Sequence, residues 1–332
     1  MKRQPSVTNP LKYEPRQPNI EILPPDLTKF REGNTGIPYV TTMDSGKPGP
    51  HVLVNALTHG NELCGAIALC QLMERGLRPV KGRITFSFSN VMAFERFDPG
   101  NPYAARFVDE DFNRLWNDNL SIRVGHSSEL LRAKALLPLV AEVDHLLDLH
   151  SMHLPANPLL ITGMQQKSLE LAQAIGYPHY VVRDAGHQAG KRMRDFAEFD
   201  DPASHKTAML VECGQHWSAT SVSVALATTL YFFYHFKLIS NKDLKQFLPP
   251  GEYPEPQKIV EVTDPVTVET TNFHFVAPFQ GFEVIPEKGT VIAYDGEKPV
   301  VTPYDDCVLV MPTPGARGAI GATAVRLGRY TV

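Results

Sequence analysis

Short apolar runs alternate with segments of helical period over the first 240 residues of the chain. Five apolar runs have the length of buried strands, at 51–57, 83–90, 145–150, 159–163 and 207–214. Apolar residues recur at helical spacing in the segments 62–76, 128–143, 166–176 and 218–239. Ser127 or Ser128 is a suitable N-cap for the second of these helices. Strands that alternate with helices predict an α/β fold whose mostly parallel sheet carries helices on both faces.

The pattern changes after Lys245. The sequence QFLPPGEYPEPQK is a proline-rich connector, and short β-type runs follow it, separated by turn signals at 286–289 and 295–296. We therefore expect a large α/β domain over residues 1–245 and a small β-rich C-terminal domain over 246–332. Residues 1–30 begin with a stretch rich in proline and polar residues, which predicts an extended N-terminal arm.

Composition narrows the class of protein. The chain has 332 residues, of which 43% are hydrophobic and 20% charged, as in an ordinary globular protein. A net charge of −4 gives no electrostatic reason to expect nucleic acid or an anionic membrane as partner. No apolar run approaches the roughly 20 residues of a membrane helix, and no apolar segment follows the two early positive charges. Four cysteines without a C-x-x-C pair argue against a disulfide framework and predict a cytoplasmic location.

Polar residues stand where the first apolar run stops. His59 and Glu62 follow the strand 51–57, and ligands gather at the carboxyl ends of the strands in an open parallel sheet. Their spacing is close to one helical turn, so both side chains can reach one ion. A second H-x-x-E pair, His126 and Glu129, follows a polar loop and serines typical of a helix cap, and is the weaker candidate.

Two other strands also end in polar residues. Asp148 and His150 are two apart and therefore share a face of their strand, and His153 is a rival to His150 as a ligand. Asp148 is placed to be a partner of the histidine. Glu212 closes the strand 207–214, where an unpaired carboxylate is costly. A cation, a proton-transfer role or an ion pair with an arginine would each explain it.

These residues together indicate a catalytic metal site. Two histidines, one glutamate and an open water position are the arrangement of a catalytic zinc, whereas structural zinc is closed and usually held by cysteines. Zinc lowers the pKa of its water towards 7, and a nearby carboxylate can take the proton as that water attacks a carbonyl. The same ligand set can also hold cobalt, manganese or nickel.

A segment rich in arginine, acids and aromatics lies between the ligand candidates. Arg106 and Arg114 belong to the sequence RFVDEDFNRLW, which has no helical period. A solvated loop with local ion pairs is one interpretation. Beside a metal, guanidinium groups can instead stabilise an oxyanion or grip a substrate carboxylate with two hydrogen bonds.

Four motifs in order resemble those of the succinylglutamate desuccinylase/aspartoacylase family, which are relatives of the zinc carboxypeptidases. They are HGNE at 59–62, the set Arg106, Asn113 and Arg114, DLH at 148–150, and VECG at 211–214. The resemblance covers roughly residues 45–240. It implies a zinc-carboxypeptidase-like α/β fold with an appended β domain.

The resemblance also implies roles for the site residues. His59, Glu62 and His150 would hold one Zn²⁺ per chain, and Glu212 would be the general base that later protonates the leaving amine. Arg106 would stabilise the oxyanion. The carboxylate of an N-acyl amino acid would be bound by Asn113 and Arg114.

We therefore expect a zinc-dependent hydrolase that cleaves the amide bond of a small N-acyl amino acid. A metallocarboxypeptidase acting on peptides and a non-catalytic metal-binding protein on the same fold are the alternatives. The acyl group stays open, as does a homo-oligomeric state. Candidates for the acyl side, none matched to a family position, are His187, Lys191, Arg192, Arg194, Tyr294 and Tyr304.

Overall fold

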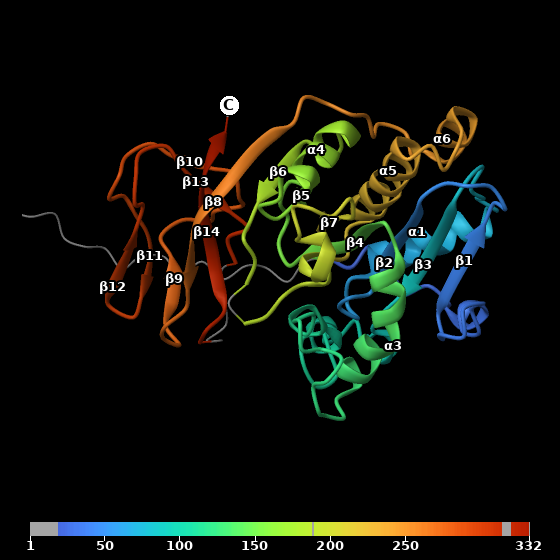
Figure 1. The fold of residues 1–332 in the computed structure, drawn as a ribbon. Helices are drawn as coiled ribbons and strands as arrows, with labels where there is room; N and C mark the ends of the chain where they lie inside the picture. The colour runs from blue at the N-terminus through green and yellow to red at the C-terminus, as the bar shows by residue number, and fades with distance from the viewer. Residues whose placement is uncertain (1–18, 188, 314–319, 332) are drawn as a thin grey trace, which may run out of the picture. The chain divides into compact units, whose positions relative to one another are not determined.

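The strands of residues 19–259 form a mixed sheet in the order β1-β3-β2-β4-β7-β5-β6 (Figure 1). The computed structural model describes residues 19–187, 189–313 and 320–331, and these separate into two compact units at residue 260. The strands are β1 (Val40–Asp44), β2 (His51–Ala56), β3 (Arg83–Phe88), β4 (His145–Met152), β5 (Leu159–Ile161), β6 (Tyr180–Arg183) and β7 (Thr207–Gln215).

Most neighbouring strands of this sheet are parallel. β2 runs parallel to β3 and β4, β4 to β7, and β5 to β6, while β1 and β5 are antiparallel to β3 and β7. The carboxyl ends of β2, β4 and β7 therefore meet at one edge. The register places Asn55 beside Asp148, and His150 beside Glu212. The predicted, mostly parallel α/β sheet is confirmed.

Helices pack on both faces of the sheet because successive strand residues point to opposite sides. Val54 and Leu147 belong to a large core with residues of α1, α4 and α5, whereas Leu53 and Leu146 belong to a second core with residues of α3. The helices are α1 (Leu63–Glu74), α2 (Val91–Phe94), α3 (Ser128–Glu142), α4 (Gln166–Ile175), α5 (Ala219–His235) and α6 (Asn241–Phe247). Short 3-10 turns are η1 (Thr28–Phe30), η2 (Pro102–Ala105), η3 (Phe112–Arg114), η4 (Met193–Asp195) and η5 (Ala197–Phe199).

Local sequence signals set several helix ends. The Ser127 hydroxyl accepts a hydrogen bond from the Leu130 amide (3.1 Å) and caps α3, as the sequence predicts. Gly176 ends α4 in the left-handed conformation with φ of 69°. The segment expected to be helical to residue 239 ends earlier, since Lys237 takes a positive φ of 55°. Ser240 then caps α6 in a box with Asp243, a helix that the sequence analysis missed.

Residues from 260 onward form a β-rich unit. Its strands β8 (Lys258–Thr267), β14 (Thr323–Thr331), β13 (Cys307–Val310) and β10 (Val284–Ile285) are neighbours in that order. A small antiparallel sheet contains β12 (Lys298–Val301), β11 (Val291–Asp295) and β9 (Phe273–Phe275). Gly296 adopts a φ of 63° in the tight turn between β11 and β12, where the sequence Asp-Gly predicts a turn.

The N-terminal arm and the connector between the domains are both expected from the sequence. Of the arm expected at 1–30, residues 1–18 lie outside the described residues, and 19–27 contain no helix or strand before η1. The connector expected from residue 246 begins only after Phe247, because that residue is the last of α6. Across the described part of the chain, every helix is too short or too polar to cross a bilayer.

Candidate metal centre

His59, Glu62 and His150 converge at the carboxyl edge of the sheet. His59 and Glu62 lie in the turn between β2 and α1, and His150 lies near the end of β4. Nδ1 of His59 is 2.7 Å from Oε1 of Glu62, and Nδ1 of His150 is 2.9 Å from Oε2. One potential ligand atom from each residue lies within 4.8 Å of the others. The three residues are at most 3% exposed, so the group is shielded from water.

The turn that carries two of these residues requires a glycine. A Cβ on Gly60 would lie 2.3 Å from the amide nitrogen of Phe94 and 2.6 Å from the carbonyl oxygen of Ala105. The Gly60 amide donates to the Arg106 carbonyl (3.1 Å), and the Trp217 indole donates to the Asn61 carbonyl (3.1 Å). The H-G-N-E segment is therefore held against the 93–106 segment by a close backbone approach that a side chain would prevent.

A carboxylate holds the far nitrogen of each histidine. Nε2 of His150 is 2.8 Å from Oδ2 of Asp148, whose Oδ1 accepts from Asn55 (2.8 Å) and Thr58 (2.9 Å). Nε2 of His59 is 3.1 Å from Oδ1 of Asp111. Such contacts fix the ring and leave Nδ1 with its lone pair for a metal. The position of Asp148 on its strand predicts this contact, whereas no local pattern marks Asp111 as a partner of His59.

The charges of the group suit a cation. Burial raises the pKa of Glu62, but His59 and His150 outweigh it and hold that pKa well below its usual value. Burial lowers the pKa of His150, yet Asp148 and Glu62 raise it well above its ordinary range. Nδ1 of each imidazole thus faces an oxygen of one carboxylate, an arrangement that a divalent ion can bridge. The donor set of two nitrogens and one carboxylate fits such an ion.

Glu212 adds a second carboxylate beside the group. It lies on β7 in register with His150 and is 8% exposed. Its Oε2 atom is buried without a hydrogen-bond partner among the described residues. Burial raises the pKa of Glu212 to about 8. A carboxyl group with a free oxygen and a pKa close to neutrality can both accept and return a proton.

Arg106 reaches the same place. Its Nη2 lies 3.2 Å from Oδ2 of Asp111 and 2.9 Å from Nε2 of His59, and its Nη1 lies 3.6 Å from Oε1 of Glu62. The Arg106 side chain is 28% exposed, so it borders both the buried group and solvent. A positive charge in this position can stabilise negative charge that develops on a substrate.

Asn113 and Arg114 follow in η3. Oδ1 of Asn113 accepts from the Met193 amide (3.1 Å), which fixes the orientation of its side-chain amide. Nη1 of Arg114 donates to the Asn113 carbonyl (2.7 Å). The described structure thus shows what orients these two side chains, and their substrate-binding roles stay predictions.

The rival ligand candidates lie elsewhere. His153 packs against the Tyr103 ring, with centroids 5.0 Å apart, and against His216 at 4.8 Å. It does not belong to the ligand group found among the described residues. His126 is exposed, and Glu129 accepts main-chain N–H groups, so the second H-x-x-E pair does not form a metal site in the described structure.

His216 and Trp217 support the site from within the core. Both are fully buried, and Nδ1 of His216 is 2.8 Å from the Ser151 hydroxyl. The Ser151 amide in turn donates to Oε2 of Glu62 (3.2 Å). Both side chains are buried just before α5, so they support the site from within the core.

The charged side chains proposed for the acyl side are largely paired within their own loop. Arg192 contacts Asp184 (3.1 Å) and Asp195 (2.6 Å), and Arg194 contacts Asp195 (2.6 Å). Lys191 pairs with Asp118. Arg192 and Arg194 are almost fully buried, so these contacts explain them as supports of the loop.

The remaining acyl-side candidates have contacts of their own. Nδ1 of His187 accepts from the Ala189 amide (3.1 Å) within the loop. In the C-terminal unit, Tyr294 stacks on His274 and the Tyr304 ring holds the Arg329 guanidinium. No substrate role follows from these contacts, and the acyl-side assignment of all three residues stays a prediction.

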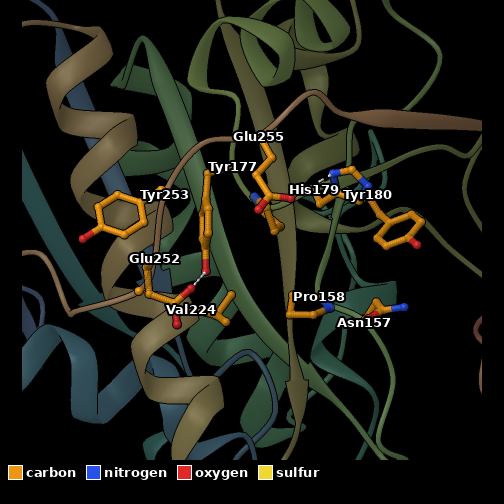
Figure 2. A pocket seen from close by; sticks show the side chains of 11 residues that line it. Asn157, Pro158, Tyr177, His179, Tyr180, Val224, Glu252, Tyr253 and Glu255 are labelled. Atoms are coloured by element: carbon orange, nitrogen blue, oxygen red, sulfur yellow. Dashed lines mark hydrogen bonds and ion pairs between the residues drawn. The ribbon is translucent and has the colours of Figure 1, made fainter.

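A separate hollow of about 370 Å³ lies near the starts of β5 and β6 (Figure 2). Its walls include Tyr177, whose hydroxyl points to the Glu252 carboxylate, together with His179 and Pro158. Burial raises the pKa of Tyr177, so the phenol stays protonated. None of the ligand group lines this hollow.

Comparisons with known proteins identify the family and the fold. The model of the succinylglutamate desuccinylase/aspartoacylase catalytic domain matches residues 48–231, more than half of the chain. A search of curated protein sequences found no match to this chain.

Several solved structures share the fold. A succinylglutamate desuccinylase from Chromobacterium violaceum aligns with a TM-score of 0.63 at 17% identity, covering 89% of each chain. A succinylglutamate desuccinylase/aspartoacylase from Rhodobacter sphaeroides aligns at 0.64 and 17%, covering 88% of this chain and 89% of that one. The ectoine utilization protein EutE (DoeB) from Ruegeria pomeroyi, solved with bound product, aligns at 0.59 and 17%, covering 89% of each. At 17% identity these structures show a common fold only. The family model matches more than half of the chain, and the chain therefore belongs to the succinylglutamate desuccinylase/aspartoacylase family.

Proposed function

We propose that the protein is a zinc-dependent hydrolase that cleaves the amide bond of a small N-acyl amino acid. The observation that carries the proposal is the convergence of His59, Glu62 and His150, with the unpartnered Oε2 of Glu212 in register beside them. Zinc held by these ligands would lower the pKa of a water molecule and polarise the amide carbonyl.

Glu212 is the proposed general base. Its carboxylate would accept the proton of the attacking water and return it to the nitrogen of the leaving amine, so that the C–N bond breaks and a carboxylic acid and a free amino acid form. The pKa of about 8 that burial gives Glu212 suits both steps, since such a group exchanges protons readily near neutral pH.

Arg106, Asn113 and Arg114 are the proposed substrate contacts. Arg106 would face the oxyanion, because its guanidinium already borders Glu62 and His59. The planar fork of Arg114 and the amide of Asn113 would bind the carboxylate of the amino acid. A protein that only stores metal needs neither Arg106 nor Glu212, which argues against a non-catalytic function.

Family membership supports the substrate class. The similar structures from Chromobacterium violaceum and Rhodobacter sphaeroides carry the names of a succinylglutamate desuccinylase and an aspartoacylase, both named for removing an acyl group. We propose the same class for this chain, with residues 1–245 as catalytic domain and 246–332 as β-rich domain. The four buried cysteines are free thiols, which supports a reducing cytoplasm as the setting.

The proposal is tested by a substrate panel. The zinc-loaded protein is incubated with N-acetyl, N-succinyl and other N-acyl amino acids and with dipeptides, and release of free amine is followed. We expect hydrolysis of at least one N-acyl amino acid, lost in Glu212→Gln. Cleavage of peptides without cleavage of any N-acyl amino acid would favour the metallocarboxypeptidase alternative.

A further inference from the structure

Glu129, the glutamate of the second H-x-x-E pair, is a fully buried carboxylate with an unusual set of partners. It lies in the first turn of α3 and is 0% exposed. Its Oε1 accepts from the Val108 amide (2.6 Å) and from the Asn90 side chain (2.9 Å). Its Oε2 accepts from the amides of Asp109 (3.0 Å) and Glu110 (3.3 Å). Three consecutive main-chain N–H groups therefore surround one carboxylate, which is an anion-binding arrangement.

The loop held in this way leads directly to the metal centre. Residues 108–110 lie between Arg106 and Asp111. Asp111 contacts Nε2 of His59 and the Arg106 guanidinium, and Arg106 extends to Glu62. A shift of the loop would displace both side chains together.

The contact between loop and helix is reciprocal. Oδ2 of Asp109 accepts from the Ser128 amide (2.7 Å) at the N-terminus of α3. Glu110 bonds the Ser127 hydroxyl and, at 2.7 Å, the Arg123 guanidinium. The loop caps the helix while Glu129 binds the loop, so each segment holds the other in place.

Only a carboxylate satisfies these donors. Four N–H groups point at two oxygens, and each oxygen receives two. A glutamine would offer one oxygen, and its NH₂ group would face two of these N–H donors in place of the second oxygen. Buried donors left without a partner are costly, so the loop would move to find water or other acceptors.

We propose that Glu129 is a positioning residue that fixes loop 108–110 and thereby places Arg106 and Asp111 at the metal centre. The catalytic part of this inference rests on the proposed function. The metal-binding part does not, because it concerns only how firmly His59 is held by Asp111.

The first test measures the zinc dissociation constant by competition with a chelator. We expect Glu129→Gln to weaken zinc binding about tenfold, the lower end of the effect of losing a contact behind a metal ligand. Leu136→Ala is the matched control: Leu136 is buried on the same helix but belongs to the apolar core. It should lower thermal stability without changing zinc affinity.

The second test separates kcat from KM with the zinc-saturated protein. A displaced Arg106 should lower kcat about 10²-fold in Glu129→Gln, since small misplacements near reacting groups have such effects. Glu129→Asp keeps both oxygens on a shorter stem and should restore part of kcat. Leu136→Ala should keep kcat below its unfolding temperature.

Hydrogen exchange of the amides in 108–110 reports on the loop itself. We expect faster exchange there in Glu129→Gln and in Glu129→Asp, with the Leu136→Ala loop unchanged. If Glu129→Gln does not fold, Glu129→Asp is used for all three measurements, with the same direction expected.

Wild-type zinc affinity and unchanged loop exchange in a folded Glu129 variant would overturn the inference. An absence of hydrolysis by the wild type on every N-acyl amino acid would instead refute the proposed function. In that case the zinc and exchange measurements still decide whether Glu129 positions the loop.

Discussion

The two H-x-x-E pairs, His59 with Glu62 and His126 with Glu129, share a sequence pattern but lie in different environments. Glu62 faces two imidazole nitrogens at a strand end, whereas Glu129 faces main-chain N–H groups at a helix start. His59 is buried and oriented by Asp111, while His126 is exposed. The partners of a buried glutamate therefore determine its role. Nitrogen lone pairs beside it favour a shared cation, and N–H donors favour a fixed loop.

The largest effect is expected at the histidines of the two pairs. His59→Ala removes one of three ligands and should reduce bound zinc from about one ion per chain to near zero. His126→Ala removes an exposed side chain and should leave the metal content unchanged. Elemental analysis of both purified variants measures the zinc content per chain. Equal zinc in the two variants would contradict the assignment of His59, and not His126, to the metal site.

The second largest effect is expected at Glu212, whose carboxylate differs from that of Glu129 in its hydrogen-bond partners. All acceptor positions of Glu129 are used by N–H groups, but Oε2 of Glu212 has no partner among the described residues. Glu212→Gln should therefore keep zinc and lower turnover about 10²–10⁴-fold, the usual range for general acid–base catalysis. Turnover at the wild-type rate with a full complement of zinc would remove Glu212 from the mechanism.

Asp109 and Asp111 lie two residues apart in the same loop, so their asparagine variants form a matched pair of test and control. Asp111→Asn weakens the acceptor that holds Nε2 of His59, so zinc affinity should fall about 10–100-fold. Asp109→Asn keeps a side-chain oxygen that can accept from the Ser128 amide, so the loop stays in place and we expect zinc affinity close to that of the wild type. Chelator competition measures both constants, and a larger loss in Asp109→Asn would reverse our assignment.

The smallest predicted change concerns the arginines. Arg114→Lys replaces a planar fork by a point charge and should raise KM about tenfold with little change in kcat, as expected for one lost hydrogen bond to a charged group. Arg123→Lys, in the ion pair with Glu110, is the control and should leave KM unaltered. Steady-state kinetics on the best substrate distinguishes them, and an unchanged KM in Arg114→Lys would exclude Arg114 from carboxylate binding.

Much of the fold could be predicted because apolar period and strand length are local properties. The runs at 51–57, 145–150 and 207–214 correspond to β2, β4 and β7 within two residues at each end. Their polar endings predict which residues meet, because parallel strands share one carboxyl edge. The strand ends therefore bring His59, Glu62 and His150 forward as candidates, and the family resemblance selects them over His153 as the ligand group.

Other parts depend on contacts that no local pattern records. β1 is an edge strand with a mostly half-buried, polar sequence, and β6 has only four residues, so neither gives a clear period. Asp111 lies in an acidic loop and acquires its partner only in the folded chain, because His59 is 52 positions away in sequence. The buried pairing of Arg192 with Asp184 and Asp195 is likewise tertiary.

The most direct test of the central claim is a zinc titration of metal-free protein in which bound metal and hydrolysis of an N-acyl amino acid are recorded together. We predict that activity rises in proportion to bound zinc and saturates at about one ion per chain. Activity that is already complete without metal, or none at all on any N-acyl amino acid when the site is filled, would contradict the account.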